Sequence, residues 1–272
     1  MPTVASRSIT IERSNVKEYV TAHNLTLDTE YFGNDCAFRS AAKTGYATLN
    51  AAAKAILFPN ATAQPVKADS TMQIGASINS SNNYVELQFG GTAVHHQLCS
   101  NANETKTGLT NAAITGAAQG TEIRYMVHIN NLFVAAIVTH VSLSLYFNRY
   151  TCTALAAGNG ITSATVSNAA PWDGDGVTFT ATLDAGATFD GWYSDAACTQ
   201  RVSTSLSYTT TAADLTLYAK ATQAVPTGTG VYIKRAGAQI QAAAVWQKAN
   251  GLWAKSDKTA IDAGKNYRLI QR

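Results

Sequence analysis

Hydrophobic and polar residues alternate with a period of two through much of this chain, which is the pattern of strands that bury one face. In Val177–Leu183 the apolar residues alternate with threonine, and in Val141–Phe147 they alternate with serine and tyrosine. Spacing typical of a helix is confined to short stretches near the beginning of the sequence. The pattern therefore predicts a mainly β fold.

The first of three predicted zones covers residues 1–153, which we expect to form an N-terminal β-sandwich or jelly-roll-like domain with short helices. One helix is predicted after an N-cap at Ser14, and a second over Thr48–Phe58 that is stopped by Pro59. A tight turn is predicted at Asn130–Asn131. The strands predicted in this zone are Ser8–Ile11, Met72–Ile78, Tyr84–Phe89, Val94–Cys99, Glu122–Ile129, Leu132–Thr139 and Val141–Phe147.

The second zone, residues 154–222, is predicted to be a small β-rich module. It contains Gly186-Ala-Thr-Phe-Asp-Gly-Trp-Tyr193, then Ser-Asp-x-x-Cys-Thr, then Leu215-Thr-Leu-Tyr-Ala-Lys220. This order resembles the Listeria–Bacteroides repeat, the B-repeat of internalin-type surface proteins. The resemblance implies a spacer or adhesion module, not a catalyst, whose core or half-core residues are Phe189, Trp192, Leu217 and Tyr218. The chain holds one copy where the family has arrays, and no cell-wall anchoring motif follows.

A Pro/Gly/Thr-rich stretch, residues 222–229, is predicted to be a linker to a third zone, a C-terminal β-hairpin domain over 228–272. An internal repeat supports it, because Tyr-x-Lys-x-x-Gly from residue 232 recurs as Trp-x-Lys-x-x-Gly from residue 246, an offset of 246 − 232 = 14. Asn250-Gly251 is a strong hairpin signal, since both turn positions need a positive φ.

Counting outward from that turn brings two tryptophans and two lysines to one side of the hairpin, with Lys248 facing Trp253 and Trp246 facing Lys255. These four residues are the candidate interaction face. The pattern Val-Tyr-Ile-Lys…Ala-Val-Trp-x-Lys-x-x-Gly-x-Trp resembles the short C-terminal tail found on many phage tail and other virion proteins. The resemblance implies a phage particle as the setting for this protein.

Composition excludes several partners. Charged residues make up only 14% of the chain, below the roughly 25% usual in soluble domains, and the net charge of +3 comes without a dense basic run. Nucleic acid is therefore not expected as a partner. The apolar run Leu132–Phe147 is shorter than the roughly 20 residues of a spanning helix, and the sequence begins without an apolar leader, so membrane insertion is not expected.

Residues with reactive or metal-ligating side chains do not form a recognisable catalytic motif. His95, His96 and Cys99 lie close in sequence, but neighbouring histidines on a strand point to opposite faces, so ordinary packed or surface roles are expected. Asp173-Gly-Asp175 begins like a calcium loop yet lacks the later ligands, which favours a tight turn. His23, His128 and His140 are scattered. The cysteines, expected to be reduced and packed although their pairing stays open, are Cys36, Cys99, Cys152 and Cys198.

We therefore expect no catalytic, cofactor-binding or metal-binding residues. A glycosidase-type pair of carboxylates is the alternative left open, because such a pair is defined by spacing in the fold and not in the sequence. Aromatic side chains could stack on sugars or pack within sheets. Packing is favoured for Trp172 and Trp192, and both roles stay open for Trp246 and Trp253, while Tyr232 is a further candidate platform.

The expected function is that of a non-enzymatic phage virion structural protein, a tail, baseplate, fibre or capsid-decoration component displayed on the particle surface. Its expected location is the virion, assembled in the host cytoplasm, and its expected partners are other virion proteins and copies of itself. The alternative is a carbohydrate-binding adhesin or receptor-binding protein that recognises host cell-surface glycans.

Overall fold

The structure is a computed structural model of residues 1–272. It describes residues 1–31, 33–41, 43–76, 83–99, 104–112, 114, 116–129, 135–223, 232–235, 238–249, 252–256 and 267–271. Residues 76, 104–112 and those from 232 onward are described by their backbone alone. The described chain is mainly β, as the period-two alternation predicts, and its sheets are antiparallel.

The chain divides into two compact units, and the first comprises Met1–Cys152, Asn168–Val177 and Thr210–Leu215. Two sheets lie face to face in this unit and enclose one hydrophobic core, which makes it the predicted β-sandwich. The six-stranded sheet contains β1 (Thr3–Glu12), β3 (Thr26–Tyr31), β4 (Asn34–Ala41), β6 (Lys67–Ala76), β9 (Glu104–Ala112) and β11 (Ala135–Arg149). The five-stranded sheet has the order β2 (Val20–His23), β5 (Gly45–Leu49), β10 (Ile123–His128), β7 (Tyr84–Phe89) and β8 (Thr92–Leu98).

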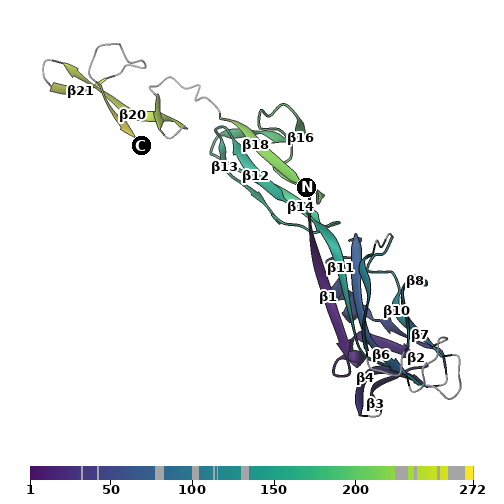
Figure 1. The fold of residues 1–272 in the computed structure, drawn as a ribbon. Coiled ribbons are helices and arrows are strands. Elements are labelled where there is room, and N and C mark those ends of the chain that lie inside the picture. Colours follow the sequence, from purple (N-terminus) through teal and green to yellow (C-terminus); the bar gives the residue numbers. More distant parts are fainter. Residues whose placement is uncertain are drawn as a thin grey trace. The chain divides into compact units, whose positions relative to one another are not determined.

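Strand β11 is the centre of the six-stranded sheet. One edge pairs with β6 along most of its length, while β4 and β1 pair in succession along the other edge (Figure 1). The register of β11 against β6 shifts between Val138 and His140, so Thr139 forms a β-bulge. The bulge coincides with the point where β1 ends, opposite His140, and this point carries the pocket described below.

The core is built by the inward-facing residues of both sheets, as the alternation predicts. On β11, Val141, Leu143, Leu145 and Phe147 are at most 1% exposed, and the residues between them are partly exposed. On β10 the buried residues are Ile123, Tyr125 and Val127, and the outer positions between them are half-buried. The hydrophobic effect of this burial is the main force that holds the two sheets together.

Both predicted helices exist, but their beginnings differ from the predictions. Helix α1 spans only Val16–Tyr19, and its N-cap is Asn15, not Ser14, whose hydroxyl donates to Glu12. Helix α2 spans Ala51–Leu57, because its first turn is capped by Asn50, whose side chain accepts a hydrogen bond from Ala53 N.

The end of α2 agrees with the prediction, since the residue before Pro59 disfavours the helical conformation and Phe58 is extended. Thr48 and Leu49, predicted as helical, are instead the last residues of strand β5. They alternate between half-buried and buried positions with the rest of that strand, which is the pattern of a strand and not of a helix.

Several strands extend beyond their predicted bounds or were missed. β1 begins at Thr3, and β11 is one strand where two segments were predicted. The residues of the predicted turn, Asn130–Asn131, lie outside the described residues, but β10 and β11 belong to different sheets and so do not form a hairpin. Strands β3, β4 and β9 were not predicted. Among the described residues no helix is long and apolar enough to span a membrane.

The second unit comprises Thr153–Ser167, Thr178–Thr209 and Thr216–Arg272. One of its sheets has the order β12 (Cys152–Ala157), β18 (Leu215–Gln223), β15 (Ala187–Tyr193) and β16 (Arg201–Ser203). A second has the order β13 (Ile161–Val166), β14 (Gly176–Leu183) and β17 (Ser207–Thr211). These strands form a small β-rich module in the middle of the chain, as predicted, while residues 168–177 and 210–215 of the predicted range belong to the first unit.

The core of this module contains the aromatic residues that the repeat motif singled out. Trp192 is fully buried, and its ring meets Phe179 edge-on at 5.8 Å between centroids and Phe189 at 6.1 Å. Gly191 has φ of +144°, and a Cβ there would lie 2.6 Å from the Ser203 carbonyl oxygen. A β-bulge here brings two backbones close together, so the motif requires glycine at position 191. The side chain of the next residue, Trp192, then enters the core.

The C-terminal strands are β19 (Tyr232–Arg235), β20 (Ala238–Ala249), β21 (Leu252–Ser256) and β22 (Tyr267–Gln271). β20 pairs with each of the other three. The predicted Asn250-Gly251 turn and most of the predicted linker, residues 224–229, lie outside the described residues.

Candidate functional site

The metal-ligating residues singled out in the sequence do not come together. His95 is 4% exposed on the inner side of β8, whereas His96 is exposed and its Nδ1 donates to Glu86 Oε1 at 2.9 Å. Cys99 is buried, and burial raises the pKa of its thiol to about 12. No group of three His, Cys, Asp or Glu side chains that could hold a metal ion occurs among the described residues.

The Asp173-Gly-Asp175 loop is closed by protein groups. Asn60 Nδ2 donates to Asp173 O at 2.8 Å and to Asp175 Oδ1 at 2.7 Å, while Trp172 N donates to Asp175 Oδ2 at 2.8 Å. Gly174 takes φ of +78°, as the predicted tight turn requires. The loop is thus a structural turn that fixes Trp172, whose ring meets Phe147 edge-on at 6.3 Å.

The four cysteines are unpaired. Cys36, Cys99 and Cys152 are buried, as the packed-thiol expectation has it, and Cys198 is half-exposed. Their pKa values are all raised, mainly by burial, which disfavours the nucleophilic thiolate.

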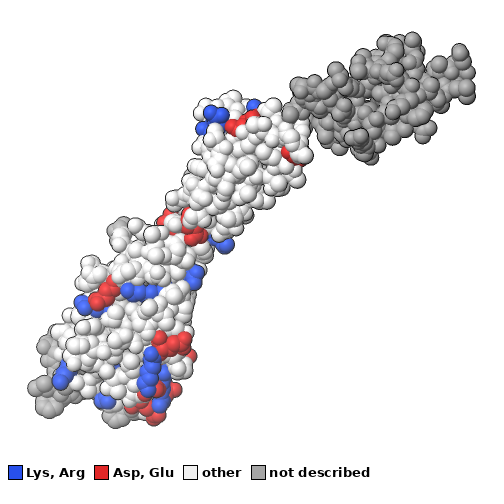
Figure 2. All heavy atoms as spheres, turned by 180° about the vertical axis from the view of Figure 1, so that it is seen from behind, with Lys and Arg blue, Asp and Glu red and all other residues white. Residues whose placement is uncertain are grey.

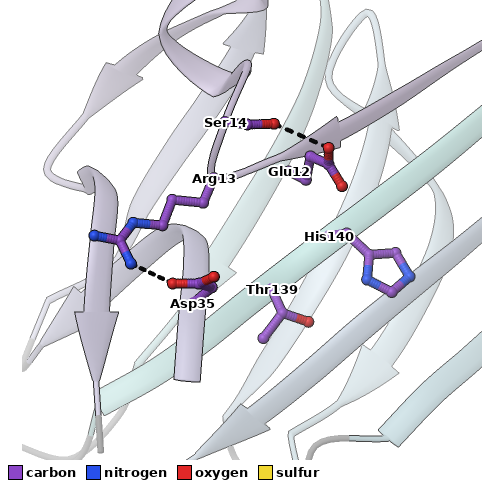
Figure 3. Close-up of a pocket in the computed structure, with 6 residues that line it drawn as sticks. All are labelled: Glu12, Arg13, Ser14, Asp35, Thr139 and His140. Atoms are coloured by element: carbon purple, nitrogen blue, oxygen red, sulfur yellow. Dashed lines mark hydrogen bonds and ion pairs between the residues drawn. The ribbon is translucent and has the colours of Figure 1, made fainter. Parts of the chain in front are cut away.

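A polar pocket of about 310 Å³ lies where β1 ends beside the bulge of β11 (Figure 3). Glu12 and His140 lie on one side of the opening, and Arg13 reaches away from them toward Asp35 on the other side, with Thr139 between. The pocket is lined by Glu12, Arg13, Ser14, Asp35, Thr139 and His140.

Ion pairs hold the Arg13 side of this pocket. The guanidinium pairs with Asp35, with Asp28 at 3.2 Å and with Glu30 at 3.6 Å, and Lys17 Nζ lies 2.7 Å from Asp28. Hydrogen bonds from Lys17 and Arg13 lower the pKa of Asp28. Exposed pairs of this kind contribute little to stability, but they fix the positions of the charged groups.

This arrangement places charged and hydrogen-bonding side chains around one small polar pocket. Asp35 forms an ion pair with Arg13, and Glu12 accepts a hydrogen bond from the Ser14 hydroxyl at 2.9 Å.

A second polar surface covers the outer face of the five-stranded sheet. Rings meet across neighbouring strands there: Tyr46 stacks on His23 at 4.8 Å and Tyr84 stacks on His128 at 4.6 Å, while Tyr84 meets His96 in a tilted pair at 4.4 Å between centroids. We call this surface the outer strip, and its residues are His23, Tyr46, Tyr84, Glu86, Gln88, His96, Arg124, Met126 and His128.

Sequence reasoning missed the outer strip, and it treated His23 and His128 as scattered residues. The signal was available in part, because Tyr84 and Glu86 on β7 and Met126 and His128 on β10 occupy alternate positions that face away from the core. The missing information was the strand order, which makes neighbours of strands that are far apart in sequence.

The predicted interaction face of the C-terminal hairpin has the expected register. Trp246 pairs with Lys255 and Lys248 pairs with Trp253 across the β20–β21 ladder. Whether this face binds a partner stays a prediction.

Comparison with known proteins supports the family resemblance in the middle of the chain. Residues 157–220 match the Listeria-Bacteroides repeat domain family, which confirms the resemblance drawn from the Gly186–Tyr193 motif. No curated protein matches the sequence. The match does not extend to residues 228–272, so their resemblance to phage tail proteins has no support from it.

One similar solved structure is the glycoside hydrolase domain of Endo-D from Streptococcus pneumoniae, at 11% identity and a TM-score of 0.21. The alignment covers 97% of this chain, which spans only 37% of that one. A similarity this low carries no argument about fold or activity.

Proposed function

We propose that this chain is a non-catalytic structural protein displayed on the surface of a phage particle, where it assembles with copies of itself and with other particle proteins. The observation that carries the proposal is the repeat module at residues 157–220, attached to a β-sandwich unit. The family resemblance implies a spacer or adhesion role for such a module. A sandwich joined to a spacer suits a protein that is held at one end and presented at the other.

The surface chemistry supports this role. Charged side chains gather in a few groups, and wide areas between them are uncharged (Figure 2). Threonine and serine hydroxyls occupy many of the outward strand positions, where they pair across strands, as Thr71 with Ser142 and Thr178 with Thr209 at 2.8 Å do. Such pairs stabilise sheets without relying on salt-sensitive charges.

The test is the composition of purified particles. Quantitative mass spectrometry should find the chain at a fixed number of copies per particle, and immunogold electron microscopy should place it outside. If the chain stays in the soluble fraction of infected cells and is missing from particles, the proposal fails.

A second candidate function, recognition of host cell-surface glycans, is favoured by the outer strip. Its aromatic and hydrogen-bonding side chains lie together on one sheet face, which is a common composition for ligand recognition. Purified chain added before infection should then reduce adsorption of the particles to host cells. Adsorption that is unchanged at saturating chain would exclude this function and leave the structural role standing.

A further inference from the structure

The floor of the outer strip is Met126, at the centre of the five-stranded sheet. Its neighbours across the two ladders are Tyr46 on β5 and Glu86 on β7, and the same row continues to His23 on β2 and His96 on β8. Polar side chains therefore surround one half-buried thioether. An apolar floor with a polar rim matches a sugar ring, which has C–H groups on its face and hydroxyls at its edge.

The polar groups around this floor are held in place by one another. Arg124 Nε donates to Gln88 Oε1 at 2.7 Å, and Gln88 Nε2 donates to Glu86 Oε2 at 2.7 Å. The other oxygen of Glu86 accepts from His96 at 2.9 Å. Both oxygens of Glu86 are thus engaged within the strip, and Arg124 forms its ion pair with Glu122, at 3.3 Å, beside the strip.

Ring stacking orients the outer hydrogen-bonding atoms. Tyr84 stacks on His128 and meets His96 in a tilted pair, and Tyr46 lies between His23 and the Arg124 guanidinium, 5.1 Å from its ring centroid. No hydrogen bond joins the Tyr46 or Tyr84 hydroxyl to another residue within the described part of the chain. The ring contacts fix these hydroxyls in position, which lowers the entropy lost when a ligand binds.

The composition of the strip favours an uncharged glycan over a protein. A protein interface of useful affinity needs a desolvated apolar centre. The large apolar side chains that are exposed in the described chain include only one on this sheet, Leu98 at its β8 edge. Five strands at about 4.8 Å spacing give a strip about 19 Å wide, room for several sugar rings in a row.

We propose that the outer strip is a binding site for a chain of uncharged sugars, with Met126 as the floor and the Tyr46 and Tyr84 hydroxyls as direct hydrogen-bonding groups. This inference rests on the second proposed function and names its site and ligand class. It is independent of whether the chain belongs to a particle.

The test uses the full chain and a variant that removes only the two hydroxyls, Tyr46→Phe with Tyr84→Phe. The probes are immobilised dextran, mannan and galactan, with hyaluronate as the carboxylated comparison, and binding is measured by biolayer interferometry. Tyr208→Phe with Tyr218→Phe, in the repeat module, is the matched control. Thermal unfolding of all three proteins verifies that the sandwich remains folded.

We expect at least one uncharged polysaccharide to bind, and the Tyr46/Tyr84 variant to weaken that binding at least tenfold while the control leaves it unchanged. Tenfold corresponds to about 1.4 kcal/mol, which two hydrogen bonds can supply. The proposal is overturned if none of the uncharged probes binds, if only hyaluronate binds, or if both variants behave alike. A changed sedimentation coefficient of the Tyr46/Tyr84 variant without loss of binding would also overturn it, because the strip would then be a contact between copies.

Discussion

Replacing Trp192 with alanine tests the repeat module at its core. The side chain is fully buried and meets two phenylalanines edge-on. Burial of a tryptophan removes roughly 150–250 Å² from water, which corresponds to about 4–6 kcal/mol at 25 cal/mol per Å². Measured losses for emptying such sites are about 3–5 kcal/mol, and we expect Trp192→Ala to fall in that range.

A milder variant refines this magnitude. The indole Nε1 is buried with no hydrogen-bond partner among the described residues, and an unsatisfied buried N–H costs about 1–3 kcal/mol. Trp192→Phe removes that N–H and keeps much of the apolar contact, so it should cost well under half of the alanine value. Thr180→Ala, on an exposed position of β14, is the control and should change stability by less than about 0.5 kcal/mol.

The assay is native-state amide hydrogen exchange by mass spectrometry on the full chain. It reports the opening free energy of β14 and β18 separately from that of β10 and β11 in the first unit. Faster exchange should be confined to the module in Trp192→Ala. Small and equal effects of Trp192→Ala and Thr180→Ala would refute the packing described for Trp192.

Three further predictions concern other parts of the chain. Burial lowers the pKa of His95, so the unfolded chain binds a proton at this histidine at higher pH than the folded chain does. The free energy of unfolding should therefore fall on acidification below about pH 6.5, by at most about 1.4 kcal/mol per pH unit. His95→Leu should flatten that dependence in urea unfolding between pH 7 and pH 5, and an unchanged slope would contradict the assignment. Limited proteolysis should cut within residues 222–230 and release a compact larger fragment, whereas cuts inside 176–220 would show that the predicted domain map is wrong. Changing both Trp246 and Trp253 to serine should weaken particle incorporation or host binding without shifting thermal unfolding of the first two domains. If the double variant assembles and adsorbs like the wild type, this face serves only internal packing.

The fold could be predicted where burial follows a regular alternation. Val177–Leu183 and Val141–Phe147 have one apolar face each, and both are strands with that face inward. β4 was missed because Cys36, Ala37 and Phe38 are all buried in succession, so its sequence does not alternate. Fully buried stretches of this kind cannot be distinguished from short helices by periodicity alone.

The candidate site was harder to predict because strand order is a long-range property. His23, Tyr46 and His128 gather on one face only because β2, β5 and β10 are neighbours in the sheet. The alternation of each strand gives the face of a residue, but loop closure and core packing decide which strands meet. The sequence could place two tryptophans and two lysines opposite one another in the C-terminal hairpin because a two-residue turn fixes that register locally.

The most direct test of the account is whether the chain binds a cell surface without cleaving it. Labelled full chain would be incubated with host cells, and the cell-bound fraction would be measured together with the release of reducing sugar ends from the surface polysaccharide. We predict saturable binding and no release above that of chain-free cells. Release of reducing ends that grows with time and chain concentration would contradict the non-catalytic role, and no binding at all would contradict the proposed recognition of glycans.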